Sequence, residues 1–214
     1  MAQIFLSHNT PEPALEIFSD ALRIAPDSLV ARLGKGLALK ELQRFNEAVT
    51  DLTACLDRDP GMGLAFDALA SLYLQTSEST RLTALSIQYM QKSPSDYRGY
   101  YYLAAAKERE KEDIAGAEQL IHRSLQLNPN FAASYALLGK LLMEENRLDE
   151  AVRELDRAIK LRPEYPPAHL HLGNAYRKLG RDSDSGREFE VLRRINDEQR
   201  SRPSLVYHRG GEKK

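Results

Sequence analysis

Five prolines return at nearly constant intervals along this chain of 214 residues. They lie in the contexts RIAPD, DRDPG, QKSPS, QLNPN and KLRPE, at Pro26, Pro60, Pro94, Pro129 and Pro163, with spacings of 34, 34, 35 and 34 residues. A fixed period in this range is the signature of a chain built from stacked copies of one supersecondary element. The period therefore limits the fold to a repeat array.

Small residues keep the same phase as the prolines. Twelve residues before the prolines lie Ala14, Ala48, Leu82, Ala117 and Ala151. A second set, 24 or 25 residues before them, is uniformly small: Ala2, Gly36, Ala70, Ala104 and Gly139. Apolar residues three and four apart flank both sets, which predicts two helices, each followed by a turn, in every repeat. Small residues let antiparallel helices approach closely, and proline ends the second helix.

These repeats resemble tetratricopeptide repeats (TPRs). The segments ARLGKGLALKELQRFNEAVTDLTACLDRDP and ASYALLGKLLMEENRLDEAVRELDRAIKLRP, residues 31–60 and 133–163, carry the resemblance most clearly. It covers roughly residues 1–197 and implies an all-α fold, a right-handed α-solenoid of stacked antiparallel helix pairs that forms a TPR-like superhelix. It also implies that the first helix of each pair lines a concave inner wall.

We expect an incomplete first repeat, five full repeats and a tail. The predicted boundaries are 1–26, 27–60, 61–94, 95–129, 130–163, 164–197 and 198–214, the last being a capping end with a flexible basic tail. The third repeat loses the pattern in its second helix, and the fourth has one additional residue around Lys111 to Gly116. We therefore expect irregular superhelix geometry around residues 76–116.

The first helix of the first repeat has room only for about Ala2 to Ser7, under two turns. A helix this short is marginal alone. Two interpretations remain open at this point: a degraded first repeat, or the C-terminal piece of a longer array.

Composition and charge argue against several classes of function. Lys and Arg total 30, Asp and Glu total 31, so the net charge of −1 provides no field to attract nucleic acid or an anionic membrane. No segment approaches the roughly 18 apolar residues that cross a bilayer, and the N-terminus lacks a signal-peptide pattern. The single cysteine, Cys55, excludes an internal disulfide. We expect a cytoplasmic protein without membrane insertion or a nucleic-acid partner.

The stretch YRGYYYL, residues 97–103, holds four of the ten tyrosines. At 100° per residue, one helical stripe contains the small Ala104 and is therefore the packing stripe: Tyr100, Leu103, Ala104 and Lys107. A second stripe is expected to face the groove: Arg98, Tyr101, Tyr102 and Ala105. Tyrosine is enriched in interface hot spots. The alternative is that Tyr101 and Tyr102 fill the core beside the irregular third repeat.

The same offsets give a set of predicted partner-binding residues on the concave surface. These are Leu33, Leu37, Arg98, Tyr101, Tyr102, Arg109, Lys140, Asn174, Arg177 and Lys178. The C-terminal half is the more basic, which favours an acidic or C-terminal segment of a partner, because arginine pairs with carboxylate through two hydrogen bonds. The alternative is that these charges are only solvated. A subset of the family grips chaperone C-termini with lysines and asparagines, but Leu33, Leu37 and Ala68 occupy three of those places here.

The sequence contains no pattern that predicts catalysis. His169 and His171 point about 200° apart on a helix, so they do not chelate one metal ion; we expect His169 in the packing stripe and His171 in the groove. Cys55 occupies a small-residue position and is expected to be buried. Phosphate-binding glycine motifs are absent. We expect no catalytic residues, no metal and no cofactor.

The interpretation that we favour is a non-catalytic scaffold that binds a peptide or helix of a partner protein in its concave groove. One alternative is the C-terminal TPR segment of a larger enzyme or assembly protein, of the glycosyltransferase or secretion and pilus type. Another is an RNA-binding helical repeat, against which the near-zero net charge argues. Self-association stays open.

Overall fold

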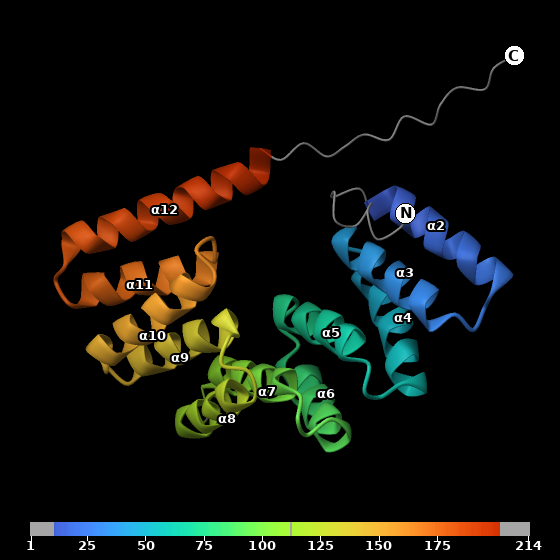
Figure 1. Cartoon of the computed structure of the whole chain (residues 1–214), viewed down its shortest axis with the longest axis horizontal. Helices are drawn as coiled ribbons and strands as arrows, with labels where there is room; N and C mark the ends of the chain where they lie inside the picture. Colours follow the sequence, from blue (N-terminus) through green and yellow to red (C-terminus); the bar gives the residue numbers. More distant parts are fainter. Residues whose placement is uncertain (1–10, 112, 202–214) are drawn as a thin grey trace, which may run out of the picture. The chain divides into compact units, whose positions relative to one another are not determined.

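The structure is a computed structural model that describes residues 11–111 and 113–201. All regular secondary structure in these residues is helical (Figure 1). The helices are α2 (Pro11–Ile24), α3 (Leu29–Glu41), α4 (Phe45–Arg58), α5 (Gly63–Gln75), α6 (Ser79–Lys92), α7 (Tyr97–Glu110), α8 (Ile114–Leu127), α9 (Ala132–Glu144), α10 (Leu148–Leu161), α11 (Pro166–Lys178) and α12 (Asp182–Ser201). The predicted helix Ala2–Ser7 and the tail after Ser201 lie outside the described residues.

The chain divides into two compact units between Thr76 and Ser77. The first unit contains α2 to α5, and the second contains α6 to α12. The division falls in the turn between the two helices of the predicted repeat 61–94 and at the start of the segment 76–116, where irregular geometry is expected.

Consecutive antiparallel helices pack against each other in both units, as the α-solenoid fold requires. In the first unit, α3 contacts α4 and α5. In the second unit, α9 contacts α7 and α11 as well as its sequence neighbours α8 and α10. The first helices of successive pairs therefore lie side by side and form one face of the second unit, which we call the inner face.

The prolines act as the sequence predicts. All five are exposed, and α2, α4, α6, α8 and α10 each end two residues before one of them. In the last repeat Asp197 takes the place of the proline, and α12 continues past it to Ser201, two residues before Pro203. The proline therefore comes six residues later than in the repeat pattern, and the helix extends beyond the predicted repeat end.

The turns inside the helix pairs share one unusual backbone conformation. A single residue with positive φ lies in each of them: Gln43, Ser77, Lys111, Asn146 and Gly180. The additional residue of the fourth repeat does not lengthen its turn. Instead α7 has 14 residues where α5 and α9 have 13.

The small residues hold the helix pairs together at close range, as predicted. A Cβ atom placed on Gly139 would lie 2.5 Å from Leu155 Cγ, and one on Gly36 would lie 2.9 Å from Leu52 Cγ. The residues twelve before the prolines are fully buried: Ala14, Ala48, Leu82, Ala117 and Ala151. In the last pair Ser185 takes this place, and its hydroxyl donates to the Gly173 carbonyl at 2.8 Å.

Ser86 marks the weak point of α6, the helix in which the repeat pattern is lost. Its side chain is fully buried, and its hydroxyl has no hydrogen-bond partner among the described residues. We expect Ser86→Ala to raise the free energy of unfolding by about 1 kcal/mol, because an unpaired buried hydroxyl is removed and alanine favours helix. Urea unfolding of both proteins measures this difference.

Ser124→Ala provides the matched contrast to this prediction. Ser124 Oγ lies 2.9 Å from Ser134 Oγ in a buried pair, so its removal orphans the partner hydroxyl and lowers stability by about 1–2 kcal/mol. A loss of stability in Ser86→Ala would show that the Ser86 hydroxyl is satisfied after all.

Candidate functional site

Four aromatic side chains on the inner face of the second unit form a continuous patch, which we call the aromatic surface: Tyr97, Tyr101, Phe131 and Tyr165. The Phe131 ring lies 4.7 Å from the Tyr97 ring and 5.1 Å from the Tyr101 ring, the latter edge to face. A side-chain hydrogen bond joins Tyr101 to Tyr165. The four rings come from three successive repeats, and each is half-buried.

Two of these rings occupy the position just before a first helix begins. Phe131 precedes α9 and Tyr165 precedes α11, each two residues after a repeat proline, and neither caps its helix with a side-chain hydrogen bond. The equivalent residue before α7 is Asp96, which does cap its helix. Aromatic residues at the capping position therefore extend the surface at the cost of a cap.

Guanidinium groups lie over the tyrosine rings at both ends of the surface. Arg98 Cζ is 5.7 Å from the Tyr97 centroid, and Arg162 Cζ is 4.9 Å from the Tyr165 centroid. Both distances fall within the range of cation–π attraction. Burial raises the pKa of Tyr165, while the Arg162 charge opposes that effect. The tyrosine therefore stays protonated, and its oxygen accepts the hydrogen bond from Tyr101.

The structure corrects the expectation for Tyr102. Its side chain is 5% exposed and packs edge to face on Tyr101, with ring centroids 5.0 Å apart. It supports the aromatic surface from beneath and offers a partner little area. Tyr100 is half-buried, and its hydroxyl donates to the Pro94 carbonyl while Arg123 lies over its ring.

Arg98 is held by its own chain. Its guanidinium donates to Asp96 at 2.7 Å and 2.9 Å, and Asp96 also accepts the Tyr89 hydroxyl at 2.6 Å. Burial alone would raise the pKa of Asp96, but the hydrogen bonds from Arg98 and Tyr89 outweigh it and lower that pKa. Burial and the bond to Asp96 raise the pKa of Tyr89 to about 12. The predicted carboxylate-binding group is thus already occupied by a carboxylate.

Lys140 is paired in a similar way, across two repeats. Its ammonium lies 2.5 Å from Glu108 Oε1, and Glu108 is only 6% exposed. The equivalent positions in the first unit are linked as well, because Lys40 donates to Ser71 at 2.7 Å. One pair of positions therefore ties successive first helices together in both units.

Two titratable groups beside this pair have shifted pKa values. Partial burial and the neighbouring Glu108 carboxylate raise the pKa of Glu144. Burial, and then repulsion from Lys140, lower the pKa of His171 to about 4, so this histidine is neutral at physiological pH. The expected basic half of the groove is therefore closer to neutral than a count of residues predicts.

The remaining predicted basic residues also have partners within the second unit. Arg109 donates to Ser77 at 2.7 Å and Lys178 donates to the Met143 carbonyl at 3.2 Å. Arg177 donates to Asn174 at 2.7 Å and lies over the Phe189 ring. These side chains are placed by intramolecular contacts, and their role in partner binding stays a prediction.

Leu33 and Leu37 lie in the first unit on α3, and both are half-buried. Two neighbouring apolar residues at equivalent repeat positions are more exposed, Val30 at 71% and Leu64 at 64%. The first unit thus presents scattered aliphatic side chains, whereas the second presents joined rings.

The histidines and the cysteine have structural environments. His169 is buried, with Nδ1 2.7 Å from Glu188 and Nε2 2.7 Å from the Pro163 carbonyl, which ties α11 to α12 as the packing stripe predicts. Cys55 is fully buried, and burial raises the pKa of its thiol. Among the described residues, no three His, Cys, Asp or Glu side chains are placed to hold a metal ion.

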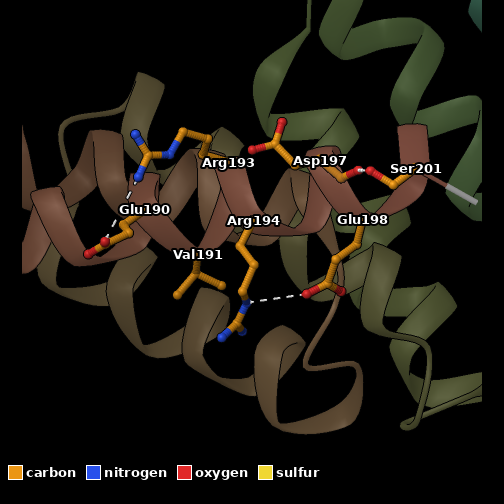
Figure 2. A pocket seen from close by; sticks show the side chains of 7 residues that line it. All are labelled: Glu190, Val191, Arg193, Arg194, Asp197, Glu198 and Ser201. Carbon is orange, nitrogen blue, oxygen red and sulfur yellow. Dashed lines mark hydrogen bonds and ion pairs between the residues drawn. The ribbon is translucent and has the colours of Figure 1, made fainter.

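Described residues of the second unit line two surface hollows. One, of about 500 Å³, is lined by residues 93–98 and adjoins the aromatic surface at Tyr97. The other, of about 610 Å³, lies along α12 (Figure 2). Its lining is dominated by exposed charges with long ion pairs, Arg193 to Glu190 at 3.9 Å and Arg194 to Glu198 at 3.8 Å, which indicates a solvated capping face.

Sequence reasoning missed Phe131 and Tyr165. The signal that reveals them is their shared place two residues after a repeat proline, where the earlier repeats carry Ser28, Met62 and Asp96. Aromatic residues occupy this position in two successive repeats, and both belong to the aromatic surface.

Comparison with known proteins agrees with the fold. A human relative, Tetratricopeptide repeat protein 13, is 24% identical over 186 residues, which is 83% of this chain and 21% of the relative. The chain therefore spans about a fifth of that relative's length.

A search of the described helices for membrane spans found none with the length and apolar character that a bilayer requires.

Solved TPR structures share the fold. TTC0263, a thermophilic TPR protein of Thermus thermophilus, aligns with a TM-score of 0.67 at 20% identity over 82% of this chain and 98% of that one. YrrB, described as a TPR protein with an unusual peptide-binding site, aligns with a TM-score of 0.55 at 16% identity over 87% of this chain and 95% of that one.

Family models match two segments directly. One, described as TPR repeat, matches residues 139–180, and another, described as Tetratricopeptide repeat, matches residues 30–62. The matched segments lie one in each compact unit, and each contains a close glycine contact between paired helices. The 34-residue period, the helix pairs and these matches together establish that the chain belongs to the tetratricopeptide repeat family.

Proposed function

We propose that this chain is a non-catalytic interaction module that holds a peptide or short helix of a partner protein against the aromatic surface. TPR proteins generally mediate protein–protein interactions, and the observation that carries the proposal here is the joined set of half-buried rings. Each ring is partly exposed, and the contacts between rings of neighbouring repeats hold the set together.

A fixed ring makes a good anchor site for physical reasons. Tyrosine and phenylalanine provide large apolar area with few rotatable bonds, so little side-chain entropy is lost on binding. Interface hot spots are enriched in such residues and each costs about 2 kcal/mol or more when truncated. The hydroxyls of Tyr97, Tyr101 and Tyr165 add hydrogen-bonding groups beside the rings.

The similarity to YrrB supports a peptide as the occupant, because that protein is described as having a peptide-binding site. An alternative is that this chain serves a larger enzyme or assembly as its repeat segment, which is favoured by its covering only 21% of the human relative. Mapping the native reading frame on both sides of this sequence separates the two, because a neighbouring catalytic domain would favour the alternative.

The test uses two neighbouring tyrosines of α7. Tyr101→Ala removes a ring of the aromatic surface, whereas Tyr100→Ala removes a tyrosine that packs toward Pro94 and Arg123. We expect at least one protein from a lysate of the native source to be retained by the wild type and by Tyr100→Ala but lost from Tyr101→Ala. Mass spectrometry identifies what is retained, and circular dichroism verifies that both variants are helical.

Equal retention by Tyr100→Ala and Tyr101→Ala would contradict the proposal. Such a result would move partner binding away from the aromatic surface, for example to the aliphatic side chains of the first unit.

A further inference from the structure

Arg162 differs from the basic residues of the second unit that are paired with carboxylates. It lies in the turn between α10 and α11, is exposed, and stacks on Tyr165 with its Cζ 4.9 Å from the ring centroid. Among the described residues, its guanidinium forms no ion pair, whereas Arg98 and Lys140 are bound to Asp96 and Glu108.

A stacked arginine keeps its hydrogen-bonding edge available. A ring beside a guanidinium contacts its flat face, whereas the N–H groups point outward in the plane of the group. A carboxylate is the acceptor that matches this edge best, since it accepts two parallel hydrogen bonds. The Arg162 guanidinium therefore lies beside the aromatic surface without a carboxylate bound to it.

We propose that the partner segment of this site is acidic, with an Asp or Glu side chain that pairs with Arg162 next to an apolar or aromatic anchor that packs on Tyr101 and Tyr165. This inference rests on the proposed function and specifies its ligand. The recognised feature is one carboxylate beside one anchor. It differs from the lysine and asparagine clamp of chaperone-binding relatives, which Leu33, Leu37 and Ala68 do not support.

Charge complementarity favours an acidic ligand over a basic one. Two carboxylates near the aromatic surface are already engaged: Asp96 binds Arg98 and Tyr89, and Glu108 binds Lys140. A basic segment would meet the uncompensated Arg162 and be repelled. An acidic segment meets a cation whose desolvation cost is reduced by its stacking on Tyr165.

The experiment selects ligands from a phage-displayed library of random peptides about a dozen residues long, with the full chain immobilised. We expect peptides enriched on the wild type to carry Asp or Glu within about three residues of an aromatic or aliphatic residue. On Arg162→Glu we expect Lys or Arg to replace the acidic residue. A synthetic peptide of the wild-type consensus should bind Arg162→Glu about tenfold or more weakly.

Arg157→Glu is the matched control. Arg157 also lies over a tyrosine, 6.0 Å from the Tyr135 centroid, but it is paired with Glu154 and lies outside the aromatic surface. The enriched sequences on this variant should equal those on the wild type. Enrichment without acidic residues, or an unchanged profile on Arg162→Glu, would overturn the inference while leaving the aromatic surface as a binding site.

Failure of the proposed function itself has a different outcome. No enrichment on the wild type, or enrichment that persists unchanged on Tyr101→Ala, would remove the aromatic surface as the site and this inference with it. Comparison of Tyr101→Ala with Arg162→Glu therefore separates the two failures.

Discussion

Gly139→Leu should destabilise the second unit by about 1–3 kcal/mol. The first atom of the new side chain already lies 2.5 Å from Leu155 Cγ and 2.8 Å from Leu155 Cδ2, and the three atoms beyond it have no space between α9 and α10. Leu155 is itself fully buried, so the clash forces the two helices apart. Thermal and urea unfolding followed by circular dichroism measure the loss.

The control for this prediction is Gly186→Ala. A Cβ atom on Gly186 would have no neighbour within 4 Å, and this residue is exposed within α12. Alanine there should leave stability unchanged or raise it by up to about 1 kcal/mol, since it favours helix over glycine. Equal melting temperatures for wild type and Gly139→Leu would contradict the assignment of α9 and α10 as a closely packed pair.

Asp96→Ala should lower the free energy of unfolding by about 2–4 kcal/mol. The carboxylate caps α7 through the Arg98 amide at 3.0 Å, accepts the Tyr89 hydroxyl at 2.6 Å and binds the Arg98 guanidinium. Loss of a cap costs about 1 kcal/mol, and loss of the acceptor of a buried hydroxyl costs about 1–3 kcal/mol. Tyr89 is 3% exposed, so water does not replace the lost acceptor.

This contribution should also depend on pH in a defined direction. The folded-state pKa of Asp96 is lowered, because its bonds to Arg98 and Tyr89 outweigh its burial, so its stabilisation is present above the unfolded-state pKa of about 4. It is lost as the pH falls through the folded-state pKa. We therefore expect wild type to be more stable than Asp96→Asn at pH 7, with the difference shrinking below about pH 4. A difference independent of pH would show that the ion pair with Arg98 adds nothing.

The repeat fold follows from the sequence because its determinants are local and periodic. Pro60 or Pro163 ends a helix through its own covalent geometry, and Gly139 allows close approach because it lacks a side chain. Such signals act within one repeat, so a single period suffices to detect them. The same logic predicted the burial of Cys55 and of His169.

The candidate site was less predictable because it depends on contacts between repeats. Tyr101 and Tyr102 are neighbours on one helical stripe, but the adjoining helices leave the first half-buried and bury the second. The sequence alone indicates that Arg98 is a free cation, whereas in the structure its guanidinium binds the Asp96 carboxylate. Phe131 and Tyr165 join Tyr101 only when three repeats are stacked. A helical wheel of one repeat contains none of this information.

The side-chain pairs that join successive first helices, Lys40 with Ser71 and Glu108 with Lys140, limit how the repeats can be rearranged. Lys40 and Glu108 occupy equivalent positions in the repeats 27–60 and 95–129, and their partners Ser71 and Lys140 are equivalent in the repeats that follow. A chimera that places repeat 130–163 directly after repeat 27–60 would set Lys140 against Lys40, two like charges at a half-buried junction. At these two junctions the repeats are therefore not interchangeable, because each linking residue matches the neighbour that it has in this order.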